Sequence, residues 1–360
     1  MYKSLTIHGF RCLANLALPD LRRVNLVAGM NNVGKTSLLE ALFLHCGAYQ
    51  PALTLRLEAF RGVEKVKVEF GKASEAPWDS LFYRFDSTSR VQIDGEMGDG
   101  SSRSVGIEVV HRAEDLAEIH RYTLHEAGSA DGARMASESA HVLLLTSDDG
   151  GSKTKYYLIL DEHGFRTEPI PPAPPFPGFM LASRSRIPFA EDAERFGKLE
   201  MVGEQGVLLS ALREVEPRLK RVAVVVGAGV PIIHGDIGLG RMVSLAYMGE
   251  GVVRLASLVL AIANARKGVV LIDEIENGLH HTLLKKIWAV VGRVASEYDA
   301  QILATTHSLE CIVAAHSAFP NRDKPDFALH RLESTKQGVQ AVTYDQVALE
   351  AAIDADLEVR

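Results

Sequence analysis

The stretch that most constrains this chain is residues 29–36, which reads Gly-Met-Asn-Asn-Val-Gly-Lys-Thr. It matches the pattern G-x-x-x-x-G-K-[ST], in which glycines let consecutive backbone N–H groups turn towards phosphate oxygens. A short apolar segment, 23–28, precedes the loop, and an apolar segment rich in helix formers, 37–46, follows it. This order of strand, loop and helix places a bound phosphate at a helix N-terminus. The sequence therefore predicts an α/β fold of the P-loop NTPase class.

The residues of this loop have separate expected roles. The Lys35 ammonium is expected to reach the β- and γ-phosphates, and the Thr36 hydroxyl to ligate Mg²⁺. A chance glycine-rich turn is the alternative, and the strand and helix on either side argue against it. The predicted nucleotide site on this loop comprises Asn31, Asn32, Val33, Gly34, Lys35, Thr36 and Ser37.

A second apolar segment ends in two carboxylates. Residues 269–274 read Val-Val-Leu-Ile-Asp-Glu, the pattern of a buried parallel strand whose C-terminal end carries charge into a site. Asp273 is predicted to hold Mg²⁺, directly or through water, and Glu274 to orient and activate the attacking water. An ordinary strand that ends in solvated acids is the alternative, which the P-loop upstream disfavours.

Further motifs carry a resemblance to a known group of proteins. They are Ile-His-Gly-Phe-Arg at 7–11, Met-Gly-Glu-Gly at 248–251, Glu-Asn-Gly-Leu-His at 276–280 and Thr-His-Ser at 306–308. With these motifs the chain resembles the ABC-type ATPase heads of the RecF, SMC and OLD superfamily. Within it, the chain is most similar to the short AAA-family ATP-binding proteins of phage-defence and mobile-element loci. The resemblance is good at both ends and in the last third, and poor over 48–180.

The resemblance implies roles by position. Gly249, Glu250 and Gly251 would form the signature loop, which caps the γ-phosphate bound by a second protomer. Met248 stands where such loops usually have serine, so backbone donors would do this work. His307 would be the switch histidine that donates to the γ-phosphate, alongside Glu274 and Lys35 as catalytic residues. Arg11 would touch the nucleotide.

Several candidates have a simpler structural alternative. Arg11 could be a solvated arginine on an edge strand, and His307 a histidine packed at a strand end. Gln50 is a candidate Q-loop residue because it lies close behind the predicted P-loop helix, although glutamine is common in loops. The His280–His281 pair is expected to start a helix, since its spacing is not that of a zinc site.

The amino-acid composition limits the classes of binding partner that this chain is expected to have. The 39 Lys and Arg against 46 Asp and Glu give a formal net charge of −7, which argues against a broadly basic nucleic-acid binder. DNA remains possible through a local patch, but the basic stretches around 56–67, 184–186 and 213–221 are expected to be solvated faces. The sequence has no run of eighteen apolar residues, so we expect no membrane span. Three widely spaced cysteines favour a reducing, cytoplasmic location.

The expected architecture is an ABC-type ATPase head, with a mixed antiparallel β-lobe and a mostly parallel core sheet flanked by helices. An N-terminal lobe, 1–175, would hold the P-loop and the β-lobe. A C-terminal lobe, 176–360, would hold the signature loop, the carboxylate strand, the D-loop at 276–280 and His307. The proline-rich run 168–177 marks the boundary. Strands are expected at 2–10, 23–28, 63–70, 106–112, 140–146, 154–160, 221–227, 328–334 and 339–344, and helices at 190–199, 204–214, 252–265, 282–297 and 346–355.

The function that these features and the resemblance imply is an ATPase that binds ATP and Mg²⁺ and assembles head to head as a homodimer or a higher oligomer. It would control a separately encoded effector, a nuclease or a toxin, in anti-phage defence. Two alternatives stay open at this point. One is a RecF-like DNA clamp in repair, and the other is a nucleotide-gated scaffold with little turnover.

Overall fold

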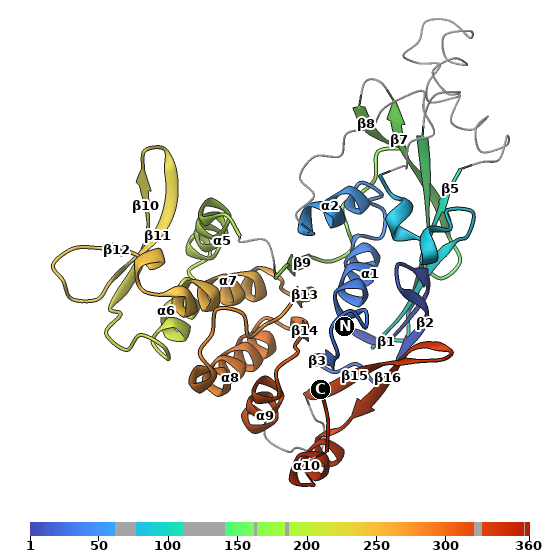
Figure 1. Cartoon of the computed structure of the whole chain (residues 1–360). Helices are drawn as coiled ribbons and strands as arrows, with labels where there is room; N and C mark the ends of the chain where they lie inside the picture. The colour runs from blue at the N-terminus through green and yellow to red at the C-terminus, as the bar shows by residue number, and fades with distance from the viewer. Residues whose placement is uncertain (62–76, 111–140, 162–163, 184–186, 320–325, 356) are drawn as a thin grey trace, which may run out of the picture.

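The computed structural model describes residues 1–61, 77–110, 141–161, 164–183, 187–319, 326–355 and 357–360 (Figure 1). These residues build two large sheets with one buried helix between them, further helices on the far side of one sheet, and a small three-stranded sheet. The strand predicted at 63–70 lies outside the described residues. Within the described ranges, no helix combines the length and apolar character needed to cross a membrane.

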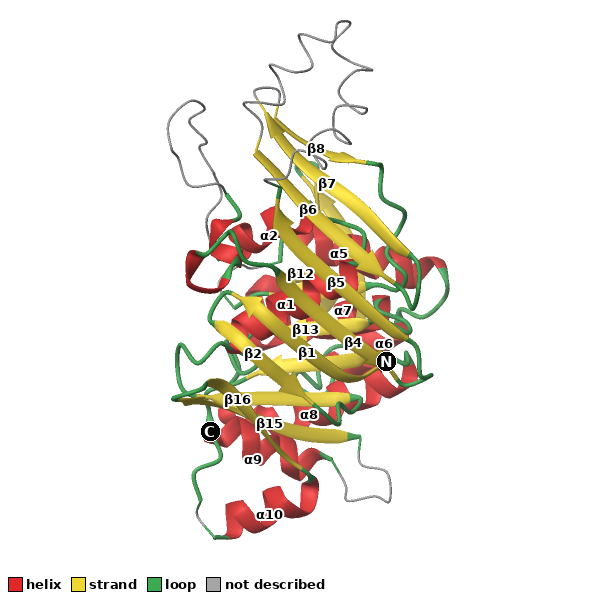
Figure 2. Ribbon diagram, turned by 90° about the vertical axis from the view of Figure 1, so that its right-hand side faces the viewer, coloured by secondary structure: helices red, strands yellow, loops and turns green. Residues whose placement is uncertain are grey.

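The first sheet has seven antiparallel strands and is the predicted β-lobe (Figure 2). Its strand order is β2-β1-β4-β5-β6-β7-β8. Buried and partly exposed residues alternate along β4, so one face of the sheet packs on the core. The strands are β1 (Tyr2–Phe10), β2 (Leu13–Leu18), β4 (Val91–Met97), β5 (Ser102–Val109), β6 (His141–Asp148), β7 (Lys153–Asp161) and β8 (Gly164–Glu168).

Strand β2 was not predicted, because the sequence analysis placed no element between the strands at 2–10 and 23–28. The chain turns already at Arg11, where φ is +50°, and β2 pairs with β1 so that Ile7 lies opposite Leu16. The segment consists of leucine, alanine and asparagine, which have little intrinsic preference for strands. Pairing with β1 and burial of Leu13, Leu16 and Leu18 determine its structure instead.

The second sheet is the core sheet of six strands, in the order β16-β15-β3-β14-β13-β9. All neighbouring pairs are parallel except β15 with β16, which confirms the predicted mostly parallel sheet. The P-loop strand β3 lies between strands from the C-terminal half, so the two predicted lobes share this sheet. The strands are β3 (Val24–Gly29), β9 (Gly178–Leu181), β13 (Val269–Ile272), β14 (Gln301–Thr305), β15 (Phe327–Thr335) and β16 (Gly338–Tyr344).

Helix α1 (Lys35–Gly47) lies between the two sheets (Figure 1) and contacts strands of both. Every residue of this helix is buried except Thr36, which explains why its sequence is apolar almost all round. Gly47 is the last residue of this helix, where a β-carbon would come within 2.0 Å of Leu53 Cδ1, and Ala48 at φ +45° caps the helix end.

The other face of the core sheet is covered by helices, among which α7 and α8 are the most prominent (Figure 1). The predicted helices in this half are confirmed to within a few residues. Helix α9 and strands β11 and β12 were not predicted. The elements are α5 (Phe189–Met201), α6 (Gly206–Leu212), α7 (Glu250–Asn264), α8 (His281–Glu297), α9 (Leu309–Ala318), α10 (Gln346–Asp354), β10 (Arg221–Gly227), β11 (Val230–Asp236) and β12 (Val243–Ser244).

Three short elements near α1 were also not predicted. Helix α2 (Leu53–Phe60) follows α1, and two short 3₁₀ turns, Asp79–Leu81 and Tyr83–Phe85, precede β4. Arg84 and Phe85 have φ of +57° and +59°, so the second turn is sharply bent. All three come from the region where the family resemblance is poor, and each contributes residues to the walls of the site described next.

Candidate functional site

The carboxyl ends of four parallel core strands meet at one edge of the sheet, where open α/β sheets bind ligands. The P-loop follows β3, Ser183 follows β9, Asp273 follows β13, and Thr305 ends β14. Side chains that are far apart in the sequence are therefore brought together at this edge.

The P-loop has the backbone that its glycines predict. Gly34 has φ +110°, and a β-carbon there would lie 2.9 Å from both Cys12 Sγ and Leu13 Cδ2, so conformation and packing both require glycine. The Lys35 Nζ donates to the carbonyl oxygens of Gly29 at 2.6 Å and Met30 at 2.9 Å. Burial lowers the pKa of Lys35, and the nearby Asp273, Glu274 and Glu276 carboxylates oppose that shift. The ammonium is thus held across the loop, next to the acidic end of β13.

Thr36 and Asp273 form the pair that could hold a metal ion. The Thr36 hydroxyl lies 3.2 and 3.3 Å from the two carboxylate oxygens of Asp273. Mg²⁺ holds oxygen ligands at 2.0–2.1 Å in octahedral geometry, so adjacent ligands lie about 3 Å apart. The two side chains therefore fit adjacent positions around Mg²⁺, and phosphate oxygens and water would supply the rest.

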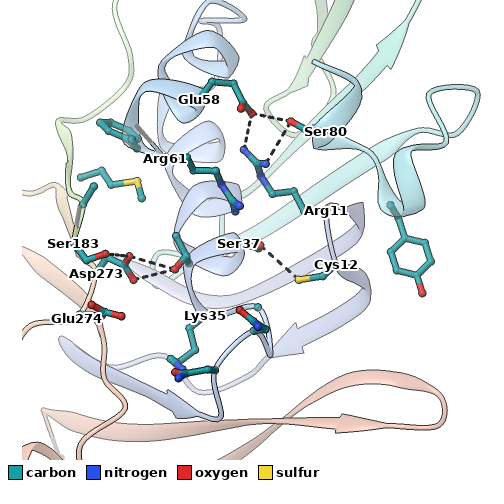
Figure 3. A pocket seen from close by; sticks show the side chains of 18 of the residues that line it. Arg11, Cys12, Lys35, Ser37, Glu58, Arg61, Ser80, Ser183, Asp273 and Glu274 are labelled. Carbon is teal, nitrogen blue, oxygen red and sulfur yellow. Dashed lines mark hydrogen bonds and ion pairs between the residues drawn. The ribbon is translucent and has the colours of Figure 1, made fainter. Parts of the chain in front are cut away.

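The Asp273 carboxylate is fixed by two further hydroxyls, of which that of Ser183 is drawn in Figure 3. Thr305 Oγ1 donates to Oδ1 at 2.7 Å, and Ser183 Oγ donates to Oδ2 at 2.9 Å. Partners of this kind orient a metal-binding carboxylate. Neither hydroxyl was predicted as a site residue. The only sequence signal is their position after short apolar segments: Thr305 ends the segment of β14, and Ser183 lies two residues beyond the segment of β9.

Glu274 is held in a specific conformation. Its φ is +47°, in the left-handed region that residues other than glycine seldom adopt. Its backbone N–H donates to Thr305 Oγ1 at 2.8 Å, and its side-chain Oε2 accepts from Asn277 Nδ2 at 2.7 Å. Backbone strain of this kind gathers at functional sites and persists only where the surroundings enforce it.

A cavity of about 1070 Å³ opens beside these residues, enough for a nucleotide. Several predicted site residues line it: Arg11, Asn31, Asn32, Gly34, Lys35, Thr36, Ser37, Asp273 and Glu274. Val33 is not among them, because its side chain is buried in the core. The far wall was not predicted and comprises Glu58, Phe60 and Arg61 near α2, Ser80, and the aromatic segment Phe82–Phe85.

Arg11 lines the cavity within a network of buried charge (Figure 3). Its Nε lies 2.8 Å from Glu40 Oε2, and its Nη2 donates to Glu58 Oε1 at 3.2 Å. Arg61 donates two hydrogen bonds to Glu40, at 2.7 and 2.8 Å. The side chain of Arg11 is 8% exposed, so it is not a solvated edge arginine. Its contact with a nucleotide remains a prediction.

His307 follows β14 and is half exposed. Its Nδ1 lies 3.3 Å from Glu276 Oε1, and its backbone N–H donates to the same oxygen at 3.0 Å. Glu276 also accepts from Thr306 Oγ1 at 2.7 Å. A carboxylate at Nδ1 leaves Nε2 as the ring nitrogen available to a ligand. His307 does not line the cavity of its own chain.

The predicted signature loop also lies outside that cavity. Gly249 has φ +106° and precedes α7 without a side-chain cap, and both Gly249 and Glu250 are exposed. The backbone N–H groups at this helix start can therefore face an anion from outside. Ser244, the nearest upstream serine, caps the turn Leu245–Tyr247 through Ala246 N.

The contacts of Gln50 and His280 bear on the roles predicted for these two residues. Gln50 does not line the cavity, and its Nε2 donates to Pro172 O at 3.0 Å, so the Q-loop assignment is wrong for this site. His280 caps α8, with its Nδ1 2.9 Å from Thr282 Oγ1, in line with the expected helix start.

The basic stretches give no support to a nucleic-acid surface within the described residues. Arg213 donates to the carbonyl oxygens of Leu219 and Lys220, and Arg218 pairs with Glu216 at 2.8 Å. Residues 65, 67, 184 and 186 of the other two stretches lie outside the described residues.

Comparisons with known proteins agree with this geometry. The family model described as "AAA domain, putative AbiEii toxin, Type IV TA system" matches residues 137–312, which include Gly249–Gly251, Asp273 and His307. A protein of Helicobacter pylori named ATP/GTP phosphatase is 21% identical over 352 residues, which are 90% of each chain. A solved SMC head bound to the C-winged helix domain of ScpA aligns over 98% of this chain and 99% of its own, with a TM-score of 0.51 and 11% identity.

The loop, the carboxylate strand and the sheet topology define a P-loop NTPase. The match to an AAA domain and the likeness to an ATP/GTP phosphatase agree with a P-loop ATPase, and the likeness to the SMC head shows that the two chains share a fold.

Proposed function

We propose that this chain binds Mg-ATP in the cavity beside α1 and hydrolyses it. The P-loop backbone and Lys35 would hold the phosphates, and Thr36 and Asp273 would hold Mg²⁺, which neutralises phosphate charge. Glu274 would orient and deprotonate the attacking water, and Lys35 would stabilise charge on the γ-phosphate. Catalysis in this class is mainly positioning and charge neutralisation.

The observation that carries the proposal is the set of oxygens around Asp273. The Thr36 hydroxyl lies 3.2 Å from its carboxylate, and Thr305 and Ser183 fix that carboxylate from behind. The next residue, Glu274, is held in a left-handed conformation beside the same cavity. A solvated strand end has no need of such an arrangement.

A second copy of the chain would complete the site. The exposed start of α7 at Gly249–Gly251 would cap the γ-phosphate bound by its partner. Support comes from the position of this helix start, which is exposed at Gly249 and Glu250 and lies outside the cavity of its own chain. His307, which follows β14 beside the P-loop strand, would donate from Nε2 to the γ-phosphate held by its own chain. ATP binding would then favour assembly, and hydrolysis would favour release.

The biological role we infer is control of a separately encoded effector, a nuclease or a toxin, in anti-phage defence. Its support is the family resemblance together with the toxin named in the family model that matches 137–312. The chain would sense or scaffold, and the effector would supply the damaging chemistry.

Phosphate release from Mg-ATP tests the catalytic part of the proposal. We expect turnover by the unmutated chain, none by Lys35→Ala because nucleotide binding is lost, and only a small residual rate by Glu274→Gln although nucleotide still binds. Arg266→Met serves as a control, since Arg266 is an exposed arginine paired with Glu204 at 2.7 Å. Unchanged turnover in Glu274→Gln would overturn the assignment of the catalytic base.

A further inference from the structure

A half-buried arginine on α7 contacts the backbone of Asp273, the candidate Mg²⁺ ligand, and of Glu274, the candidate catalytic base. Arg254 Nη2 donates to the carbonyl oxygen of Asp273 at 3.2 Å and to that of Glu274 at 3.4 Å. Its Nε is buried, with no hydrogen-bond partner among the described residues. Burial lowers the pKa of Arg254, while the carboxylates of Asp273, Glu276, Glu250 and Glu274 act in the opposite direction. A positive charge is thus enclosed at the point where the site's acids gather.

The same helix contacts the far end of this acidic segment. Gly278 has φ +75°, and a β-carbon there would lie 2.8 Å from Glu250 Cγ, so the Glu250 side chain packs directly on its backbone. Glu250 and Arg254 are four residues apart and lie on the same face of α7. The first turns of α7 therefore contact residues 273–278 at both ends.

Glu274 belongs to the segment 273–278 that Arg254 and Glu250 contact at its two ends, and its conformation is fixed by three hydrogen bonds. Thr305 Oγ1 holds its N–H, Asn277 holds its carboxylate, and Arg254 holds its carbonyl oxygen. A hydrogen bond from a guanidinium is stronger than one between neutral groups. Because the left-handed φ of Glu274 needs enforcement, the placement of Arg254 helps to decide where the carboxylate points.

We propose that Arg254 is a positioning residue that links the N-terminus of α7 to the Glu274 carboxylate within one chain. The inference rests on the proposed function, in which the start of α7 contacts the γ-phosphate held by a second copy. Engagement of that helix start places Arg254, and Arg254 places Glu274. Hydrolysis in one site then depends on whether the same chain has engaged its partner's nucleotide.

The test compares Arg254→Met, which removes the donors and keeps an apolar stem, with Arg254→Lys, which keeps the charge. For each we would measure the Kd of a fluorescent ATP analogue, the kcat and KM of phosphate release, and the melting temperature. We expect Arg254→Met to lower kcat about tenfold to a hundredfold, as misplacement of a catalytic group by up to about 1 Å does, with Kd within twofold of the unmutated value. The kcat of Arg254→Lys should lie between that of Arg254→Met and that of the unmutated chain. Arg266→Met, at the other end of α7, should leave every value unchanged.

A double-mutant cycle separates positioning from a general structural role. If Arg254 acts through Glu274, Arg254→Met adds nothing to the residual rate of Glu274→Gln. The inference would be overturned if the two substitutions lowered kcat by independent factors that multiply in the double variant. It would also be overturned if Arg254→Met lowered kcat only together with a marked loss of ATP affinity and of melting temperature. Absence of turnover in the unmutated chain would instead contradict the proposed function. Normal turnover by both the unmutated chain and Arg254→Met would contradict this inference alone.

Discussion

Replacing Thr305 by valine should destabilise the protein and impair the site together. The residue is fully buried at the end of β14, where its hydroxyl donates to Asp273 at 2.7 Å and accepts from the Glu274 N–H at 2.8 Å. Valine has the same shape and suits a strand, so the change removes only these two hydrogen bonds. A bond to a charged carboxylate is worth about 1.5–3 kcal/mol, and a buried N–H left unpaired costs about 1–3 kcal/mol. The expected loss of unfolding free energy is the sum, about 2.5–6 kcal/mol.

Urea denaturation followed by the fluorescence of Trp78 and Trp288, both buried, measures this loss. Thr305→Ser is the matched control, because it keeps the hydroxyl and loses one methyl group, worth about 1 kcal/mol. We also expect phosphate release to fall in Thr305→Val and to persist in Thr305→Ser. If valine and serine destabilise equally, the hydroxyl does not organise the site and the reasoning fails.

The remaining predictions concern the metal, pH and the D-loop. Asp273→Asn should abolish phosphate release and remove the gain in ATP affinity on adding Mg²⁺, measured by titration with and without a chelator; a persisting gain would place the metal elsewhere. Burial lowers the pKa of His45 and His330 to about 4. The unfolded chain therefore binds more protons than the folded chain between about pH 6.5 and 4. The free energy of unfolding should be unaffected by these histidines above pH 6.5 and should fall towards pH 4 by up to about 3 kcal/mol for each of them. His45→Gln should flatten that decline in denaturation curves taken across this range, and an unchanged slope would refute the assignment. Gly278→Ala should reduce both stability and turnover, since the new methyl group meets Glu250 Cγ at 2.8 Å; a neutral effect would show that the helix start does not bear on this loop.

The parts of the fold that could be predicted from the sequence are those whose conformation depends on residues nearby in the chain. The P-loop glycines, the four apolar residues of β13 and the amphipathic pattern of α8 each report a conformation that depends mainly on their own neighbours along the chain. The parallel order of the strands also follows once β3 and β13 are recognised, because both must end at the same edge.

The rest of the site depends on contacts between distant segments. Ser183 reaches Asp273 only because β9 pairs with β13, and no motif marks it. Arg254 reads in the sequence as an ordinary helical arginine, although it donates to carbonyl oxygens about twenty positions away. The wall around Glu58 lies in the region where the family resemblance is poor.

The most direct test of the ATP-clamped head is its mass in solution, measured by light scattering. We would measure the unmutated chain, Lys35→Ala and Glu274→Gln, each without nucleotide and with Mg-ATP. We expect the mass of Glu274→Gln with Mg-ATP to rise to about twice the 39.2 kDa of one chain or more, and that of Lys35→Ala to stay the same. A mass that is the same for all three proteins with and without ATP would contradict assembly around the nucleotide.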